Sequence, residues 1–387
     1  SLKKIAVNQY DAILTAHPES RNLRPSLFDF LAHRAIDFYS GSESGLTQPA
    51  SRFLVDNPVF YSDPQTFTAM NIITPDTFSF EYHAVLLLQE LLAWHLADKD
   101  PSALVDADLK RLRLIHEYCI LPENDSLYST ALRRLESRYL DHPSSTDVSC
   151  ELAGLLVESA SACKPLVSGD HKWELKEAYE KASSAISRFP DTQGANNCRA
   201  IIEQIEQPSL DITTEYAVPP RQAALALVTY KNVEKLYLRI LEGNAEKDHN
   251  ITGDGQEDAV REYVNRQPLK TWSVDLPNDG DYQSHSTEIS LPPLENGFYI
   301  MLASPDEKFD KISPVTVNRF WRTGISYIST RSDEGDYDIY VLDRDEGSPI
   351  TEMNVQPFYE SYDYRTRRHE NKPGNIFKTD KSGYINI

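Results

Sequence analysis

YDIYVL (337–342) is followed by a charged turn, by Pro349 and by a second apolar stretch through Val355, and the chain closes on FKTDKSGYINI (377–387). A strand, a G-x-P turn, more strand and a T-D-x-x-G-Y turn are typical of small secreted β-sandwich modules, because Gly, Asp and Pro suit tight turns. No stretch before about residue 207 has this pattern of short strands separated by such turns. The sequence therefore predicts a helical part followed by a β part, which favours a piece of a modular scaffold over a compact enzyme.

The first 206 residues have apolar side chains at three- and four-residue spacing, the pattern of amphipathic helices. Helices are expected over 7–18, 25–40, 78–97, 104–119, 126–141, 145–162, 172–188 and 193–206, with an irregular insertion over 44–75. Three of these helices close at His17-Pro18, His142-Pro143 and Phe189-Pro190. Because Pro cannot continue a helix, each helix should end there and a second one should follow. The units resemble the tetratricopeptide pattern without its Trp-Leu-Gly part, so we expect a TPR-like hairpin array over 1–206.

From Pro208 onward apolar residues alternate with polar ones, which is typical of β-strands. Strands are expected over 223–230, 236–241, 271–276, 286–291, 297–303 and 314–320, and their spacing indicates an antiparallel, immunoglobulin-like β-sandwich over 207–323. Its core should hold Trp272, Phe298 and Ile300. The polar stretch 243–258 is expected to be a surface loop before a short helix, DAVREYV (258–264), and a second, smaller sandwich should occupy 324–387.

The composition narrows the class of protein. The chain has 387 residues, 40% of them hydrophobic, with a formal net charge of −20 and a pI near 4.9. An acidic surface repels phosphate backbones, so nucleic-acid binding is disfavoured. No apolar stretch is long enough to span a membrane, and the first ten residues do not read as a signal peptide. The abrupt start and the strand at the end lead us to expect a piece of a longer chain.

All four cysteines lie in the helical part: Cys119, Cys150, Cys163 and Cys198. None has the spacing of a metal site, and buried free cysteine commonly packs as a small hydrophobic residue. If Cys150 and Cys163 share one helix, about 20 Å separates them, so they should not form a disulfide with each other.

Few residues are candidates for chemistry, and each has a plainer explanation. His83 and His95 are three turns apart and should not share a metal. His116 and Cys119 lie on one face of a helix, where packing explains them. The carboxylate-rich turns 279–281 and 333–336 lack EF-hand spacing, although calcium stays open there. Because no hydrolase, zinc or phosphate-loop motif is present, we predict no catalytic, cofactor-binding or metal-binding residues, no cofactor and no enzymatic activity.

Several stretches resemble the macroglobulin domains of the α2-macroglobulin family, above all its large bacterial members with a helical N-terminal region. They are PSLFDFLAHRAIDFY (25–39), ALVTYKNVEKLYLRIL (226–241), DYQSHSTEISLPPLENGFYIMLAS (281–304), YVLDRDEGSPITEMNV (340–355) and FKTDKSGYINI (377–387). The last module also resembles the carboxypeptidase-regulatory-like fold. Many family members use a bait region and a thioester in Cys-x-Glu-Gln. The nearest string here, CRAIIEQ (198–204), has the wrong spacing and is predicted to be helical.

The resemblance implies a non-catalytic N-terminal scaffold of a bacterial α2-macroglobulin-like protein, made of a helical domain and two macroglobulin-type sandwiches. It implies an extracytoplasmic place, in the periplasm or at the cell surface, and protein partners that include proteases. The alternative is a glycan- or peptide-binding module of a surface protein, which aromatics clustered on an exposed sheet face or in a helical groove would favour. A third reading is an enzyme whose site is assembled from distant carboxylates with perturbed pKa values.

Overall fold

The computed structural model describes residues 2–14, 20–41, 51–165, 167–248, 255–310, 314–331, 335–363 and 368–387. The chain divides into two compact units, each with a core of its own. The helical unit comprises Ser1–Gln207 together with Gly280–Gln283, and the β unit comprises Pro208–Asp279 and Ser284–Ile387.

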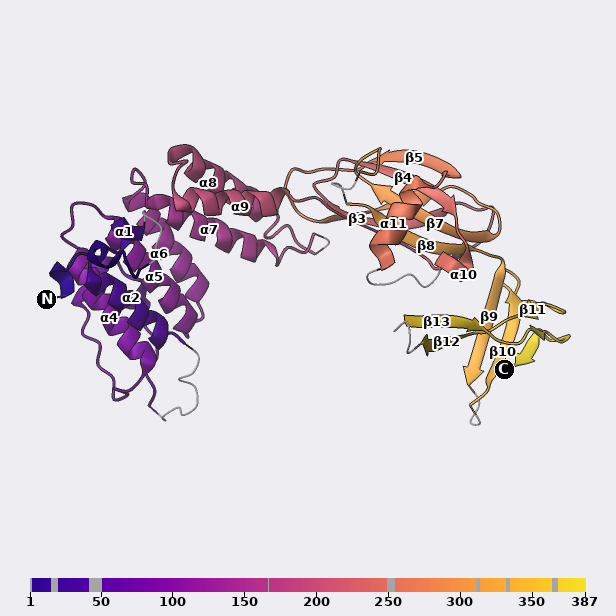
Figure 1. Ribbon diagram of the computed structural model, residues 1–387, viewed down its shortest axis with the longest axis horizontal. Helices are drawn as coiled ribbons and strands as arrows, with labels where there is room; N and C mark the ends of the chain where they lie inside the picture. Colours follow the sequence, from indigo (N-terminus) through magenta and orange to yellow (C-terminus); the bar gives the residue numbers. More distant parts are fainter. Residues whose placement is uncertain are drawn as a thin grey trace. The chain divides into compact units, whose positions relative to one another are not determined.

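The helical unit consists mainly of α-helices (Figure 1), and its described residues also form three 3-10 turns. In chain order its elements are η1 (Leu2–Lys4), η2 (Val7–Tyr10), α1 (Ser20–Leu23), α2 (Leu27–Tyr39), η4 (Pro58–Tyr61), α3 (Pro64–Ala69), α4 (Phe80–His95), α5 (Ser102–Tyr118), α6 (Asn124–Arg138), α7 (Ser145–Ala160), α8 (Glu174–Arg188) and α9 (Gln193–Glu206). The seven longer helices, α2 and α4 to α9, match expected helices in place and extent.

Local chemistry explains where these helices begin and end. Ser26 and Asp29 form a capping box at the start of α2, and the Thr192 hydroxyl accepts the Ala195 N–H at the start of α9. Such caps satisfy backbone N–H groups that have no partner inside the helix. Helix α8 ends at Arg188, just before Pro190. The prediction is therefore confirmed at Pro190. Helix α6 ends earlier than predicted, at Arg138 and not at His142-Pro143, and Pro18 lies outside the described residues.

Two expectations for the helical part were wrong. Residues 7–18 do not begin with an α-helix, because only the 3-10 turn η2 forms over Val7–Tyr10; positions 15–18 lie outside the described residues. The insertion 44–75 is not irregular throughout. It contains η4 and α3, and α3 begins at a Pro preceded by Asp63, whose carboxylate accepts the N–H groups of Gln65 and Thr66. A capping Asp and a Pro at the first helical position are standard signals of a helix start, and a search for apolar periodicity alone does not detect them.

Among the described residues, the β unit has one five-stranded sheet, two three-stranded sheets and two two-stranded sheets. Its elements are β1 (Ser209–Thr214), β2 (Ala217–Val218), β3 (Ala224–Lys231), β4 (Lys235–Glu242), α10 (Ala245–Asp248), α11 (Gly255–Asn265), β5 (Lys270–Asp275), β6 (His285–Leu291), β7 (Gly297–Ser304), β8 (Thr316–Arg322), β9 (Ile325–Arg331), β10 (Tyr337–Asp343), β11 (Asn354–Val355), β12 (Phe358–Asp363), β13 (Arg368–Pro373), β14 (Phe377–Lys378) and β15 (Tyr384–Asn386). The six strands expected before residue 321 are present as β3 to β8.

A three-stranded sheet in the order β1-β3-β6 packs on a five-stranded sheet in the order β2-β8-β7-β4-β5. Their shared core includes Val228 and Leu291 from the first sheet and Leu238, Met301 and Phe320 from the second. The ladders are antiparallel apart from the short parallel pair β2–β8. The sequence between 207 and 323 therefore forms two packed sheets.

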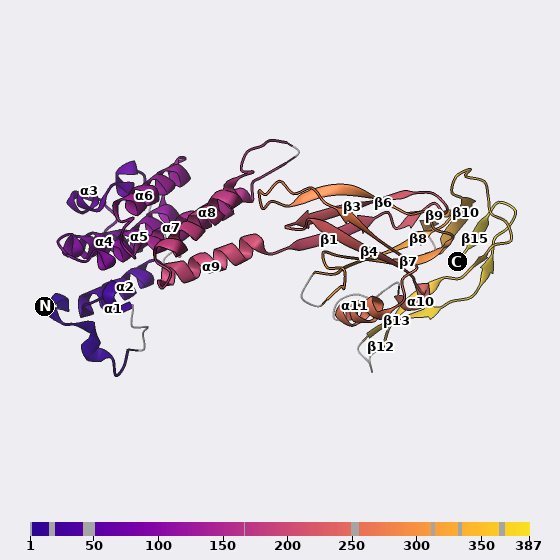
Figure 2. The ribbon, with the colours of Figure 1, turned by 90° about the horizontal axis from the view of Figure 1, so that it is seen from above.

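Strand β7 is buried on both faces, and this corrects the predicted core. Tyr299 and Met301 face the other sheet. Phe298 and Ile300 lie on the opposite face, in a second cluster with Tyr263 of α11. Figure 2 shows the resulting three layers, with β3 and β6 on one side of the five-stranded sheet and α10 and α11 on the other. Trp272 is only partly buried against the inter-sheet core. The stretch 243–258 is likewise not a plain surface loop, because it contributes α10 and the start of α11.

The closing strands form the turns that the sequence predicts. Asp380 Oδ1 accepts the N–H groups of Ser382 (2.8 Å) and Tyr384 (2.9 Å), and Gly383 has a positive φ of 73°. A Cβ at Gly383 would lie 2.4 Å from the Val341 carbonyl oxygen. Only glycine fits this turn without strain. The turn brings β15 beside β10, which pairs with β9 on its other side.

Candidate functional site

One hollow of the described helical unit lies over one face of α7. Helix α7 packs against α6 on one side and α8 on the other (Figure 2), and the cavity above it measures about 450 Å³. We call it the α7 groove. Its lining residues are His116, Asp125, Ser126, Ser129, Arg133, Leu152, Leu155, Leu156, Glu158, Ser159, Glu174 and Lys181.

The floor of the groove is apolar and its walls are polar. Leu152 is buried, while Leu155 and Leu156 are half-buried and exposed to the hollow. Ser126 and Ser129 project from α6 along one wall. A hollow of this size, with an apolar base and a few converging polar groups, has the character of a ligand-binding site.

One end of the groove is closed by an ion pair. Lys181 Nζ from α8 lies 3.0 Å from Glu136 Oε2 of α6. The Ser149 hydroxyl donates to Glu136 Oε1 at 2.5 Å, and Arg188 Nη2 donates to Ser149 Oγ at 3.0 Å. Because these contacts join α6, α7 and α8, the walls cannot separate at this end without breaking a partly buried ion pair.

Two histidines hold residues at the other end of the groove: His116 lines it, and His171 contacts the lining residues Ser159 and Glu174. His116 Nε2 lies 2.9 Å from Asp125 Oδ1, and its ring stacks on Tyr128 with centroids 4.2 Å apart. Burial and a hydrogen bond to Glu151 raise the pKa of the Tyr128 phenol, so it stays a neutral donor. On the α8 side, His171 Nδ1 lies 3.0 Å from Glu174 Oε1 and 3.1 Å from Ser159 Oγ. Both rings are fixed by carboxylates.

Two charged residues of the groove keep their side chains available. Arg133 and Glu158 are exposed, and neither has an ion-pair partner among the described residues. Arg133 stands on α6 and Glu158 on α7, so a ligand in the groove meets one positive and one negative group. A polypeptide backbone or a zwitterionic side-chain pair suits such a surface better than a uniformly charged ligand does.

The residues singled out by sequence are not brought together. His83 lies beside the rings of Tyr39 and Tyr82. His95 is buried between Asp29 and Asp98. His116 belongs to the groove, whereas Cys119 caps the end of α5 and does not line the groove, so these two do not act as a pair.

The carboxylate-rich turns differ in what the structure shows of them. At 279–281, Gly280 has a positive φ of 68°, and the buried Asp281 accepts the Gln283 N–H at 2.9 Å. This is ordinary turn chemistry. Asp333 and Glu334 lie outside the described residues. Among the residues that are described, no group of three or more His, Cys, Asp or Glu side chains has the geometry of a metal site, and no helix is long and apolar enough to cross a membrane.

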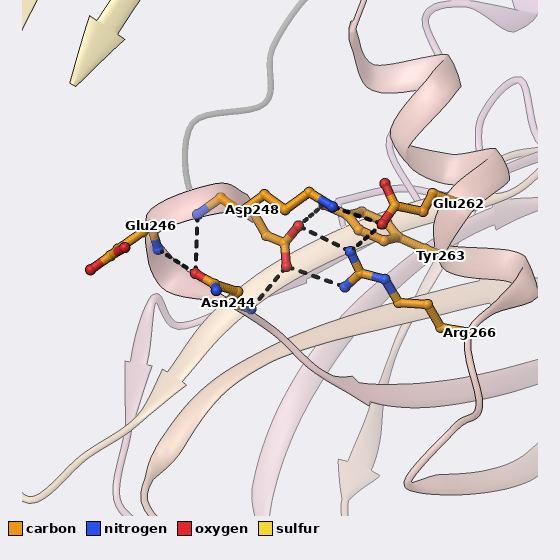
Figure 3. A network of polar contacts seen from close by, with 7 residues as sticks. Asn244, Glu246, Asp248, Glu262, Tyr263 and Arg266 are labelled. Atoms are coloured by element: carbon orange, nitrogen blue, oxygen red, sulfur yellow. Dashed lines mark hydrogen bonds and ion pairs between the residues drawn. The ribbon is translucent and has the colours of Figure 1, made fainter.

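The β unit has a polar network of its own beneath α10 and α11 (Figure 3). Asp248 is fully buried. Its carboxylate accepts hydrogen bonds from the Asn244 N–H (2.8 Å), the Tyr263 hydroxyl (3.1 Å) and Arg266 Nη1 (3.2 Å). Burial alone would raise the Asp248 pKa, but the hydrogen bonds from Arg266 and Asn244 outweigh it and hold that pKa below its ordinary value. The network joins the two helices that cover β7, and we assign it a structural role.

Known proteins give limited comparisons. No family model and no curated protein sequence matches the chain. Among solved structures, the chain resembles a fragment of native alpha-2-macroglobulin from Escherichia coli spanning domains MG0-NIE-MG1, at 15% identity and a TM-score of 0.29, over 47% of this chain and 57% of that one. It also resembles a point mutant of Salmonella alpha-2-macroglobulin, at 10% identity and a TM-score of 0.22, over 47% of this chain and 15% of that one.

Sequence reasoning did not find the α7 groove. Leu152, Leu155 and Leu156 have the spacing of a buried helix face, and nothing local shows that part of this face lies open. The serines and charged residues that face these leucines come from neighbouring helices. The sequence alone does not show this arrangement, because it depends on how α6, α7 and α8 pack together.

Proposed function

We propose that this chain is a non-catalytic, protein-binding scaffold and part of a longer α2-macroglobulin-like protein outside the cytoplasm, where it helps to engage proteases. The order of a helical unit and packed sheets supports the architecture. The observation that carries the binding function is the α7 groove, in which an apolar floor lies between polar walls. We propose an extended segment of a partner protein as its occupant, because side chains can pack on the leucines while the serines hydrogen-bond the backbone.

Blocking the groove tests this function. Secreted serine, cysteine and metalloproteases, each with its active site chemically blocked, are measured for binding to the immobilised chain by biolayer interferometry. Ser129→Trp fills the groove from α6. Ser137→Trp is the matched control, because Ser137 is exposed on the same helix and does not line the groove.

We expect at least one protease to bind, Ser129→Trp to weaken that binding by about tenfold or more, and Ser137→Trp to leave it unchanged. Arg133→Glu should weaken binding as well, since it reverses an available charge. If none of the proteases binds, the proposal that the chain engages proteases is wrong. If the two tryptophan variants bind a protease with equal affinity, the α7 groove is not the binding site.

Absence of catalysis is the second half of the proposal. The chain is mixed with active proteases and a large protein substrate, and both digestion and covalent adducts are followed. We expect digestion to proceed at the rate seen without the chain, and no adduct to form. Inhibition or an adduct would show that the chain itself carries trapping chemistry.

A glycan-binding module is a second candidate, because one sheet of the last strands exposes aromatic rings. Tyr340 of β10 and Tyr384 of β15 are cross-strand partners with ring centroids 5.2 Å apart. Tyr340 is 43% exposed, and Ile328, opposite it on β9, is 58% exposed. Aromatic faces of this kind can stack on sugar rings. Binding to a glycan array that Tyr340→Ala abolishes and Ser129→Trp spares would favour this function over the first.

A further inference from the structure

Helices α7 and α9 approach each other unusually closely at their first turns. A Cβ at Gly194 would lie 2.4 Å from Thr146 Oγ1 and 2.5 Å from the Asp147 backbone nitrogen. The hydroxyls of Thr146 and Thr192 are 2.9 Å apart. Because these contacts join the starts of both helices, only glycine at 194 permits the packing.

The next turn of each helix places a cysteine at the same contact. Cys150 follows Thr146 by four residues and Cys198 follows Gly194 by four, so both stay on the facing sides of their helices. Cys150 packs against the buried cluster that contains Cys198. Cys198 is fully buried in the core shared by α7, α8 and α9, whereas Cys150 is half-exposed. The register shows that α7 and α9 run in the same direction.

We propose that Cys150 and Cys198 are a disulfide-forming pair, and that their bond fastens α7 to α9 under oxidising conditions. A disulfide requires Cα atoms within about 7 Å and facing Cβ atoms. These cysteines lie one turn beyond the close contact of Gly194 with Thr146, on the facing sides of two packed helices, and can meet this need with small side-chain rotations. Buried cysteine packing explains Cys198 alone, but not a second, partly exposed cysteine packed against the same cluster.

The environment of the pair also assigns the order of the chemistry. Cys150 is partly exposed, whereas Cys198 is fully buried. The Cys150 thiolate therefore attacks first, and it is the one that solvent reaches. With glutathione disulfide as oxidant, it forms a mixed disulfide and releases one glutathione thiolate. Cys198 then loses its proton to water, attacks the Cys150 sulfur and releases the second glutathione. Two protein thiols are oxidised and one disulfide is reduced.

The other two cysteines are not part of this pair. Cys119 caps the end of α5. Cys163 lies beyond the end of α7. Cys150→Ser and Cys198→Ser therefore have a matched control in the double variant Cys119→Ser/Cys163→Ser, which keeps the pair and removes the other thiols.

The test uses the full chain, first reduced and then equilibrated with glutathione buffers of increasing oxidised fraction. Free thiols are alkylated and the protein is mapped by mass spectrometry. We expect one cross-linked peptide pair, Cys150 with Cys198, carrying two hydrogens fewer than the reduced pair, with Cys119 and Cys163 alkylated. The double serine variant should give the same cross-link, and the oxidised protein should melt at a higher temperature than the reduced one.

Single variants separate this pair from accidental oxidation. Cys198→Ser should leave Cys150 carrying glutathione, because the attacking thiol remains and the resolving one is gone. Cys150→Ser should leave Cys198 largely unmodified. Full alkylation of both thiols at every glutathione ratio, or a cross-link that joins either one to Cys119 or Cys163, overturns the proposal. The wild-type map decides this even where a variant folds poorly.

Discussion

Asp29 of the helical unit and Asp248 of the β unit are both fully buried carboxylates that join two helices. Asp29 caps the start of α2 through Ser26 and binds His95 Nε2 of α4 at 2.9 Å. Asp248 accepts the N–H of Asn244, just before α10, and binds Arg266 just beyond α11. The geometry is alike and the cations differ. A guanidinium stays charged throughout the useful pH range, whereas an imidazole does not.

This difference should make only the helical unit pH-sensitive near neutrality. Burial alone would lower the His95 pKa, but hydrogen bonds to Asp29 and Asp98 outweigh it and raise that pKa above 6.5. Burial likewise works to raise the Asp29 pKa, and the bonds from His95 and Ser26 hold it below 3.8 instead. The pair is therefore charged between these values, and a buried charge that loses its partner is costly.

The largest effect is expected from removing the imidazole. His95→Leu leaves Asp29 buried with no cationic partner, so we predict a loss of about 3–5 kcal/mol in the free energy of unfolding of the helical unit. The background carries Trp272→Phe and Trp321→Phe, so that urea unfolding is followed by the fluorescence of Trp94 and Trp173. Asp98→Asn is the control, because Asp98 is 39% exposed and should cost about 1 kcal/mol or less. Equal losses would show that burial of Asp29 does not matter.

The pH dependence should have two limbs, set by two histidines with opposite shifts. His95, with its raised pKa, contributes stability that is complete below 6.5 and is lost as pH rises through the folded-state pKa. Burial, partly offset by Asp106, lowers the pKa of His33 to about 4. His33 therefore contributes stability that is lost as pH falls from 6.5 to about 4, by about 3 kcal/mol.

Helical-unit stability should accordingly be greatest near pH 6.5. Urea unfolding at a series of pH values, in the same tryptophan background, measures both limbs. His33→Gln should flatten the acid limb and His95→Leu the alkaline one. A profile that neither variant alters would mean that other groups control the titration.

The sequence predicts the elements better than their packing. Pro190 and Thr192 mark the end of α8 and the start of α9 because their effects act within one turn. Gly383 and Asp380 mark the last turn for the same reason. Strand β7 shows the limit. Its run FYIMLA is apolar at every position, so alternation cannot tell which face meets the other sheet.

The remaining features depend on residues far apart in the chain. The prediction that Phe298 lies in the inter-sheet core is wrong. The sequence predicts helix 258–264, but it does not show that this helix packs onto the face of β7 that carries Phe298. The α7 groove could not be predicted either, since Leu155 and Leu156 look like ordinary core residues until α6 and α8 leave them open. Asp29 and Asp248 carry no local sign of their buried partners, His95 and Arg266. Such contacts follow from tertiary packing, which periodicity does not encode.

In the β unit, Asp248→Asn should cost about 2 kcal/mol, because it weakens charge-assisted hydrogen bonds to a buried side chain while leaving its shape. Fluorescence of Trp272 and Trp321, in a background with Trp94→Phe and Trp173→Phe, reports this unit. Between pH 5.5 and 8 the loss should not change by more than about 0.5 kcal/mol, since neither Asp248 nor Arg266 titrates there. If the destabilisation by Asp248→Asn varies with pH in this range, then the Asp248 pair is pH-sensitive too and does not differ from the Asp29 pair in this respect.

The smallest effect is expected from the exposed end of the same network. Glu262 Oε1 accepts from Lys247 Nζ at 2.9 Å and from Arg266 Nη2 at 2.8 Å, and its side chain is 49% exposed. The Arg266 hydrogen bond, followed by that from Lys247, lowers the Glu262 pKa, but water and salt screen an exposed pair. Glu262→Gln should therefore reduce stability less than Asp248→Asn does, and the loss should shrink as salt is raised while that of Asp248→Asn persists. If both variants cost the same and respond equally to salt, then the charge around Arg266 stabilises α11, and burial of Asp248 adds nothing to it.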